Sequence, residues 1–285
     1  MRRRRRLEEN VFKVLMACAT LFILAILGII IYSIFEKGTR AISWEMLTQV
    51  PKGGYYYGKE GGILNAILGS LSLAFGSTLL AFLLGLPVAL FMNVFLVRRK
   101  RAVAFIRFLL DLVWGIPSIV YGAFGFSLMI FLGLQTSLLA GIMTVTLFIL
   151  PIMIRSIDEI LQTVQIGLME ASYSLGSNKS ETAFRIFTRQ AFSGIVTAIL
   201  LSFGRAIGDA ASVLFTAGYT DNLPNSFLEP VATLHLSIFF QLSSPVPAVQ
   251  DRAYASALVL TVLILIVSLF SRGIGKRYHK TKINF

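Results

Sequence analysis

The sequence predicts an all-α, polytopic membrane protein with about six transmembrane helices. Of its 285 residues, 56% are hydrophobic and 14% are charged, and the mean hydropathy is +0.77. This apolar content exceeds that of soluble domains, and it is gathered into runs long enough to cross about 30 Å of hydrocarbon. The basic residues lie mostly on one side of these runs, which is typical of a chain that crosses a membrane repeatedly.

Six apolar runs are the expected spans, and each reaches or approaches the length of about 17 to 25 residues that a spanning helix needs. The runs are Val11 to Phe35, Leu64 to Val97, Val113 to Leu134, Leu138 to Ile154, Phe192 to Gly218 and Ala255 to Leu269. We therefore expect one membrane domain with a packed or swapped first helix. Its parts are a basic N-terminus (1–10), the first helix (11–35), an extracytoplasmic loop (36–63), a transmembrane core (64–274) with a cytoplasmic loop (156–191), and a basic tail (275–285).

The basic residues predict the orientation. Twenty of the 26 Lys and Arg fall at residues 2–13, 98–107, 155–189 and 272–282, which share one side of the predicted membrane. By the positive-inside rule, both termini face the cytoplasm. Nucleic-acid binding would require such charges on a soluble face, so the charge pattern argues against it.

The basic start followed by an apolar run also resembles a secretory signal peptide, with small residues at Ala17-Cys18-Ala19. However, the apolar run continues for some seventeen residues beyond that point, whereas a signal peptide has its apolar core before the cleavage site. We therefore expect an uncleaved first helix, in which Cys18 is a small apolar residue facing lipid.

No catalytic constellation or metal site is expected. His235 and His279 lie on opposite sides of the predicted membrane, so they cannot share a metal ion. Gly275-Lys276 is followed by Arg277, which does not match the phosphate-binding loop of nucleotide hydrolases. The chain itself should need no cofactor, and nucleotide-driven work would come from another chain.

The cytoplasmic loop between the fourth and fifth runs predicts two short helices joined by a tight turn. Gly176 suits a left-handed helix end, and Asn178 followed by Glu181 resembles a capping box. The apolar faces of the two helices are expected at Ile166, Met169 and Tyr173, and at Ala183, Phe184 and Phe187. Such a hairpin either rests on the lipid surface or inserts as a rigid peg into a groove of a partner.

The segment Glu170-Ala171-Ser172-x-x-Leu175-Gly176 resembles the cytoplasmic EAA loop of ABC importer permeases. The resemblance implies that Glu170, Ala171, Ser172, Leu175 and Gly176 dock onto an ATP-binding subunit. The general pattern closes with Leu-Pro, where this chain has Thr188-Arg189.

Further segments are similar to the phosphate-specific ABC permeases and, late in the chain, to their PstA type rather than PstC. They are Gly61-Gly62-Ile63-x-Asn65-Ala66-Ile67-x-Gly69-Ser70, Pro117-Ser118-Ile119-Val120-x-Gly122, Leu150-Pro151-Ile152-x-Ile154-Arg155, Arg205-x-x-Gly208-Asp209-x-Ala211, Phe215-Thr216-Ala217, Ala232-Thr233-Leu234, Ser244-Pro245 and Ala253-Tyr254-Ala255. The resemblance covers nearly the whole chain and implies the type I permease fold of ABC importers.

The same resemblance implies the function and the partners. The chain would be the permease subunit of an ATP-driven importer of inorganic phosphate in the cell (inner) membrane, form half of the pathway, and couple to a separate ATPase through residues 170–189. Partners would be a PstC-like permease subunit, an ATP-binding cassette ATPase dimer holding ATP and Mg, an extracytoplasmic phosphate-binding protein and membrane lipids. Alternatives are a permease for sulfate, molybdate or tungstate, a gradient-driven secondary transporter with paired broken helices, and a channel, which would need no coupling loop.

Arg205 and Asp209 are the first candidate pathway residues. Four residues apart on a predicted spanning helix, they would share one face, and a central Arg costs about 2.5 to 3.5 kcal/mol on insertion scales. They either form an internal salt bridge or line the path, where Arg205 offers its planar fork to phosphate oxygens. Asp209 would then accept a hydrogen bond from protonated phosphate and repel sulfate. The phosphate permeases usually have Glu at this position.

Arg155 and Ser118 complete the candidate set. Arg155 ends the fourth run, where it anchors the helix at the headgroups, pairs with Asp158 and Glu159, or, as the resemblance implies, receives the departing anion. Ser118 follows Pro117 and either faces the pathway or bonds within its own helix.

The loops carry two further expectations. Trp44 and Tyr55 to Tyr57 suit either docking of a binding protein or an aromatic belt at the membrane interface. A surface or re-entrant helix is expected around Val231 to Phe240.

Overall fold

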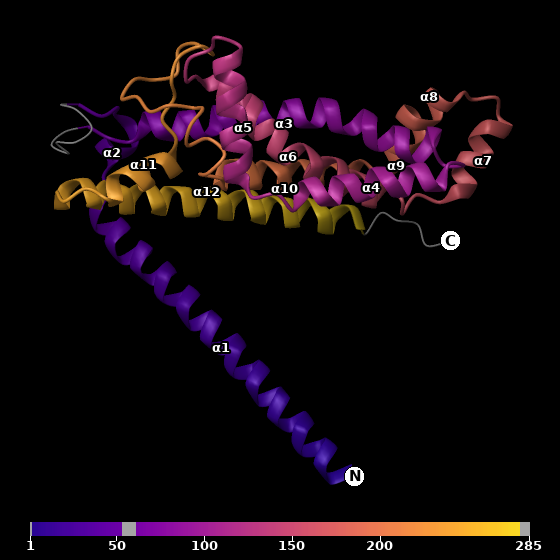
Figure 1. Cartoon of the computed structure of the whole chain (residues 1–285), viewed down its shortest axis with the longest axis horizontal. Coiled ribbons are helices and arrows are strands. Elements are labelled where there is room, and N and C mark those ends of the chain that lie inside the picture. The colour runs from indigo at the N-terminus through magenta and orange to yellow at the C-terminus, as the bar shows by residue number, and fades with distance from the viewer. Residues whose placement is uncertain (1, 53–60, 280–285) are drawn as a thin grey trace.

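The computed structural model describes residues 2–52 and 61–279, without the side chains of 2–7, 272 and 274–279. The predicted roles of Arg2 to Arg6, Tyr55 to Tyr57 and most tail cations therefore lie outside the described residues. The described part is built from helices, as expected, and forms an elongated bundle from which α1 departs at an angle (Figure 1).

The helices follow one another along the whole described chain. Their bounds are α1 Arg2–Ala41, α2 Trp44–Thr48, α3 Leu64–Leu90, the π-helix η1 Phe91–Phe95, α4 Lys100–Trp114, α5 Ser118–Phe131, α6 Leu138–Leu161, α7 Ile166–Ser174, α8 Lys179–Glu181, the π-helix η2 Thr182–Phe187, α9 Thr188–Gln190, α10 Phe192–Gly208, α11 Leu234–Leu242 and α12 Pro247–His279. The helix expected around Val231 to Phe240 is confirmed as α11.

Four helical stretches are long and apolar enough to cross a membrane, namely Glu8–Ala41, Leu64–Phe95, Leu138–Leu161 and Pro247–Ser271. Two further candidates are bent pairs of helices: α4 with α5 bends by 91°, and 179–190 with α10 bends by 76°. The described residues therefore hold four to six candidate spans, and the six expected spans are reached when each bent pair counts as one.

Two of the predicted runs are not continuous helices. The run from Val113 to Leu134 is interrupted between α4 and α5 at Pro117, which has no backbone N–H and disfavours helical backbone in the residue before it. The run from Phe192 to Gly218 is helical only to Gly208. Asp209 has extended backbone (φ −90°, ψ 119°), and residues 211–217 form turns. Gly and Asp are weak helix formers, which favours an end at this point.

The centre of the bundle is the close packing of α3 against α6. A Cβ atom added at Gly76 would lie 2.6 Å from Ile142 Cδ1, so a larger residue here would require the Ile142 side chain to move. The hydroxyl of Thr146 in α6 donates to the Ser77 carbonyl of α3 at 3.3 Å. Side chains of both helices form the buried core, including Leu73, Ala74, Ala81, Val145, Ile149 and Met153.

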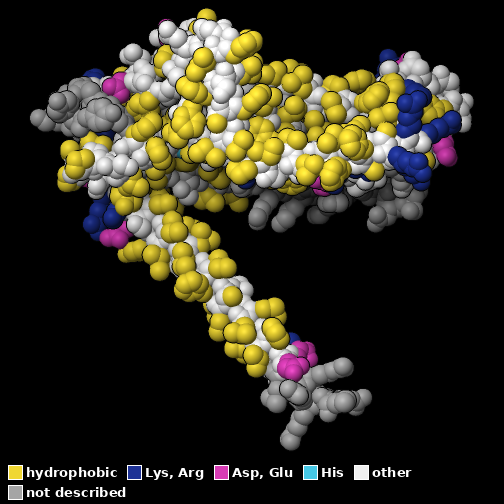
Figure 2. Space-filling model, in the orientation of Figure 1, with side chains coloured by type: hydrophobic (Ala, Val, Ile, Leu, Met, Phe, Trp, Pro, Cys, Tyr) yellow, Lys and Arg dark blue, Asp and Glu magenta, His cyan; other side chains and the backbone are white. Residues whose placement is uncertain are grey.

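The first helix is packed at one end only. Near its C-terminus, Gly38 lies against Leu258 of α12, and Lys37 Nζ lies 3.2 Å from the Tyr254 hydroxyl. The rest of α1 extends away from the bundle with its apolar side chains exposed (Figure 2). This matches a helix whose surroundings are lipid or another chain.

Candidate functional site

The loop between α6 and α10 forms the predicted helical hairpin. Gly176 has a positive φ of 84°, which ends α7 in the left-handed conformation. The Glu181 backbone N–H donates to Asn178 Oδ1 at 2.8 Å, and the Asn178 N–H donates to Glu181 Oε2 at 3.0 Å, so the capping box is confirmed. The hairpin of α7 and α8 lies at the end of the bundle opposite to α2 and α11 (Figure 1).

A buried hydrogen bond joins the two sides of this hairpin. Ser172 Oγ lies 2.9 Å from Thr182 Oγ1, which also contacts the Asn178 carbonyl at 2.9 Å. The predicted apolar faces are only partly confirmed, because Met169 is buried whereas Ile166 is exposed. Phe184 is also exposed, because residues 182–187 form a π-helix, whose wider turn changes which side chains share a face.

The predicted coupling motif divides into two groups of residues. Ser172 is buried and Gly176 forms the turn, so both shape the hairpin. Glu170, Ala171 and Leu175 point outward, with Leu175 87% exposed. Lys and Arg side chains gather at this end of the molecule (Figure 2).

Arg205 and Asp209 are not the helical pair that the spacing predicts. Asp209 lies beyond the end of α10, where its Oδ2 accepts a hydrogen bond from the Ser212 backbone N–H at 2.9 Å. Within the described residues no salt bridge joins it to Arg205. The exposed Arg205 instead places its Cζ 5.1 Å from the centre of the Phe148 ring in α6. The predicted internal salt bridge is therefore wrong for this arrangement, and Arg205 keeps its charge uncompensated by a carboxylate.

The start of α5 lies at the same junction as Arg205 and Asp209. Phe148 packs edge-on against Tyr121 at 5.6 Å, and the Tyr121 hydroxyl donates to the Val113 carbonyl across the bend at 2.7 Å. Ser118, half-buried, begins α5 one turn before Gly122. A Cβ atom at Gly122 would lie 2.7 Å from the Ala211 carbonyl, so α5 rests directly on the turn that Asp209 caps.

Sequence reasoning missed His235 as a neighbour of this turn. Its side chain is 95% buried, Nε2 lies 3.1 Å from Thr233 Oγ1, and Nδ1 has no hydrogen-bond partner. Burial lowers the pKa of His235 to about 4, against the opposing effect of the Asp209 charge, so the ring is neutral at neutral pH. A lone His in an apolar helix carries no sequence signal that would have singled it out.

Arg155 is surrounded by carboxylates at the opposite end of α6. Its Nε donates to Asp111 Oδ1 at 2.9 Å, its Nη1 to Asp158 Oδ2 at 3.0 Å, and its Nη2 lies 3.8 Å from Glu159 Oε1. The expected pairing with Asp158 and Glu159 is confirmed. The contact with Asp111 was not expected, because that residue lies 44 positions earlier in the chain.

Asp158 is the fully buried centre of this charged group. Arg107 of α4 donates a hydrogen bond to each carboxylate oxygen, from Nε to Oδ2 at 2.8 Å and from Nη2 to Oδ1 at 2.9 Å. Asn93 of η1 donates to Oδ1 at 2.8 Å, and Gln162 donates to Oδ2 at 3.0 Å. Asp158 therefore ties η1 and α4 to α6 through charge-assisted hydrogen bonds, which are roughly twice as strong as neutral ones.

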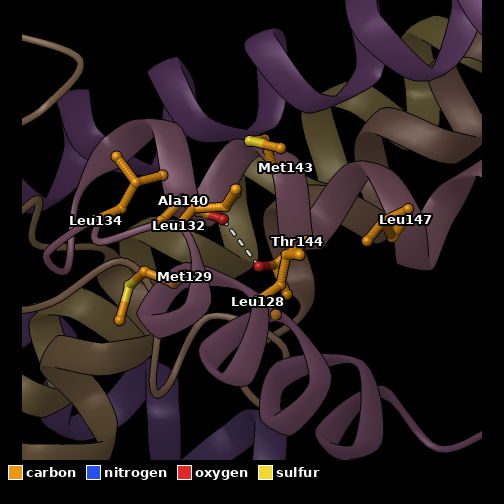
Figure 3. Close-up of a pocket in the computed structure, with 9 residues that line it drawn as sticks. Leu128, Met129, Leu132, Leu134, Ala140, Met143, Thr144 and Leu147 are labelled. Carbon is orange, nitrogen blue, oxygen red and sulfur yellow. Dashed lines mark hydrogen bonds between the residues drawn. The ribbon is translucent and has the colours of Figure 1, made fainter.

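Two cavities in the described part of the chain are not lined by the candidate residues. One of about 10 Å³, room for about one water molecule, lies between α5 and α6 (Figure 3), where the Thr144 hydroxyl donates to the Ala140 carbonyl at 2.8 Å. Another of about 240 Å³ lies beside the α4 and α5 bend. It is lined by Leu110, Val113, Tyr121, Phe124, Leu147, Leu150, Pro151 and Ile154. Arg205, Asp209 and Arg155 line neither, so the groups suited to an anion lie outside these cavities.

The fold is that of an ABC importer permease. It is similar to a chain in an inward-facing structure of the MetNI methionine ABC transporter, with a TM-score of 0.61 and 19% identity over 75% of this chain and 95% of that one. Residues 83–280 match the family described as binding-protein-dependent transport system inner membrane component. The chain belongs to that family, as a permease of the PstA type.

Its relatives match over almost their whole length. The phosphate transport system permease protein PstA of Xylella fastidiosa strain Temecula1 is 32% identical, with 95% of this chain and 94% of the relative covered. The proteins of the same name from Haemophilus influenzae and Mycobacterium leprae are 32% and 33% identical, with 85% and 98% of this chain and 85% and 91% of the relatives covered. The chain is thus a transport subunit with several membrane spans that works with ATPase and substrate-binding partners.

The buried charge of Asp158 yields a stability prediction. Asp158→Leu leaves Arg107 and Arg155 without their shared buried partner, and breaking such a pair costs about 3 to 5 kcal/mol. We expect a thermal unfolding midpoint several degrees lower for the purified protein in detergent. Glu159→Gln is the matched control, because Glu159 is 63% exposed and 3.8 Å from Arg155. Equal midpoints for the two variants would contradict a structural role of Asp158.

Proposed function

We propose that this chain is the transmembrane permease subunit of an ATP-driven importer of inorganic phosphate. The observation that carries the proposal is the geometry at the end of α10, where Arg205 has no carboxylate partner among the described residues and Asp209 lies just past the helix end. The chain matches two relatives that are named phosphate transport permeases over nearly their full length, which supports the substrate class.

The two groups fit the chemistry of phosphate. Arg205 presents a planar fork of N–H donors, which matches phosphate oxygens. Asp209 is held by the Ser212 N–H through Oδ2, and we assign Oδ1 to the proton that phosphate still carries near neutral pH. Sulfate has no such proton, so the carboxylate repels it.

The proposed partners are those that a half-pathway and the exposed hairpin would require. A PstC-like subunit completes the pathway, an ATP-binding cassette dimer holds ATP and Mg, and an extracytoplasmic phosphate-binding protein delivers the anion. Both termini face the cytoplasm, as does the hairpin.

Ser118 lines the path beside Arg205 and Asp209, and Arg155 receives the anion on the cytoplasmic side. Glu170, Ala171 and Leu175 contact the ATPase, and Ser172 and Gly176 shape the hairpin.

The function is tested in lipid vesicles that contain this chain, the PstC-like subunit, the ATPase and the binding protein. We expect radiolabelled phosphate to enter only with hydrolysable ATP, and sulfate, molybdate and tungstate to leave that flux unchanged. Uptake that follows an ion gradient without ATP would indicate a secondary transporter instead. Competition by one of these oxyanions would identify a permease of different specificity.

Arg205→Gln removes the charge but keeps a polar side chain of similar length. Because a charge-assisted hydrogen bond contributes about 1.5 to 3 kcal/mol, we expect phosphate uptake to fall by about tenfold or more. Co-purification with the partner subunits should be unchanged. Arg40→Gln is the control, because Arg40 is exposed at the end of α1 and pairs only with Glu36 among the described residues. Normal uptake by Arg205→Gln would refute the pathway role.

Leu175→Asp tests the docking surface of the hairpin. Leu175 is 87% exposed at the tip of the hairpin, so a charge there leaves the fold intact but opposes burial in an ATPase groove. We expect the ATPase to be lost on co-purification while the thermal midpoint of this chain is unchanged. Trp44→Ala, which changes a side chain 79% exposed at the other end of the molecule, should keep the ATPase bound. Retention of the ATPase by Leu175→Asp would exclude this contact.

A further inference from the structure

The buried carboxylate of Asp158 has no free acceptor site. A carboxylate offers about four lone-pair positions, and five N–H contacts reach this one. Oδ1 accepts from Asn93 and Arg107, and Oδ2 accepts from Arg107, Arg155 and Gln162. The Arg155 contact is therefore one of three that share a single oxygen, Oδ2.

More negative than positive charge surrounds the Arg155 guanidinium in this arrangement. Its guanidinium faces three carboxylates, those of Asp111, Asp158 and Glu159, while Arg107 adds one further positive charge to the group. The formal charge of the group is therefore −1. An anion that arrives here meets a net negative group, so Arg155 can receive it only after its contacts with these carboxylates loosen.

A continuous set of contacts connects this group to the cytoplasmic hairpin. Asn93 belongs to η1, a π-helical turn between α3 and α4, and such turns often occur at functional sites. Its Nδ2 lies 2.8 Å from Asp158 Oδ1 and 2.9 Å from the Ala89 carbonyl. On its other side η1 packs against η2 of the hairpin, and Lys179 Nζ lies 5.9 Å from the centre of the Phe95 ring.

We propose that Asp158 is a positioning residue that sets the availability of Arg155 to the anion, and that Asn93 transmits the hairpin movement to it. Asn93 and Asp158 lie on different elements, so a shift of η1 relative to α6 breaks their hydrogen bond. The carboxylate then relaxes onto Arg107, its bidentate partner, and releases Arg155 from its one fully buried partner, so that only the exposed carboxylates of Asp111 and Glu159 compete with the anion. This inference rests on the proposed function, because it assigns the control of the same exit site.

The structure provides a matched control for the transmission step. Gln162 donates the same kind of amide N–H to the same carboxylate, but it lies on α6 itself, four residues after Asp158. Loss of Gln162 removes a donor without cutting a link between elements. Loss of Asn93 removes a donor and the link to η1.

The experiment compares Asn93→Ala with Gln162→Ala in the full complex in vesicles, measuring phosphate imported per ATP hydrolysed and the KM for phosphate. Coupling between sites typically amounts to 5- to 150-fold, so we expect Asn93→Ala to lower the phosphate to ATP ratio by about fivefold or more, with ATP hydrolysis and KM retained. Gln162→Ala should leave the ratio unchanged, and Asn93→Gln, which restores the amide donor, should recover part of it. Equal loss in both alanine variants, or no loss in either, would overturn the proposal.

A second measurement separates this proposal from the proposed function. If the wild-type complex imports no phosphate, the function is wrong, but the link can still be measured by amide hydrogen exchange with and without ATP. We expect ATP to change exchange at residues 155–162 in the wild type and in Gln162→Ala, but not in Asn93→Ala. Should Asn93→Ala fail to fold, Lys179→Gln weakens the hairpin contact from an exposed position and should reduce the same response. An unaltered response in the variant used would exclude the link.

Discussion

The close approach of α3 and α6 is the constraint on which the other features depend. Glycine at position 76 of α3 leaves room for the Ile142 side chain of α6, and side chains of both helices share one buried core. α6 carries Phe148 beneath Arg205 near its middle, and Arg155 with Asp158 about two turns further on, past Pro151. One helix therefore presents both groups.

Interruptions of the apolar helices place the polar groups. Pro117 breaks the α4 and α5 span, and the end of α10 after Gly208 releases Asp209 from the helix. Irregular backbone at membrane depth is tolerated where it is covered by protein, and Gly122 of α5 covers the turn at Ala211 here. The same breaks that shorten the spans therefore bring parts of three helices together.

The two arginines differ in their electrostatic surroundings although both were candidates for the anion. Arg205 lies over an aromatic ring, a contact worth roughly 0.5 to 2 kcal/mol that leaves its N–H edge for a ligand. The guanidinium of Arg155 forms ion pairs with three carboxylates. In the proposed function, Arg205 is therefore open to an anion, whereas Arg155 must first be released from its carboxylates.

The sequence by itself determined the all-helical membrane class, the capping box at Asn178 and the turn at Gly176, because hydrophobic runs and helix caps are local properties. It also predicted the pairing of Arg155 with Asp158, three residues away. Only the tertiary structure decided that Asp111 and Asn93 join this group, since they lie 44 and 65 positions from their partners. It also separated Arg205 from Asp209, because the four-residue spacing places two side chains on one face only while the helix continues, and α10 ends between them.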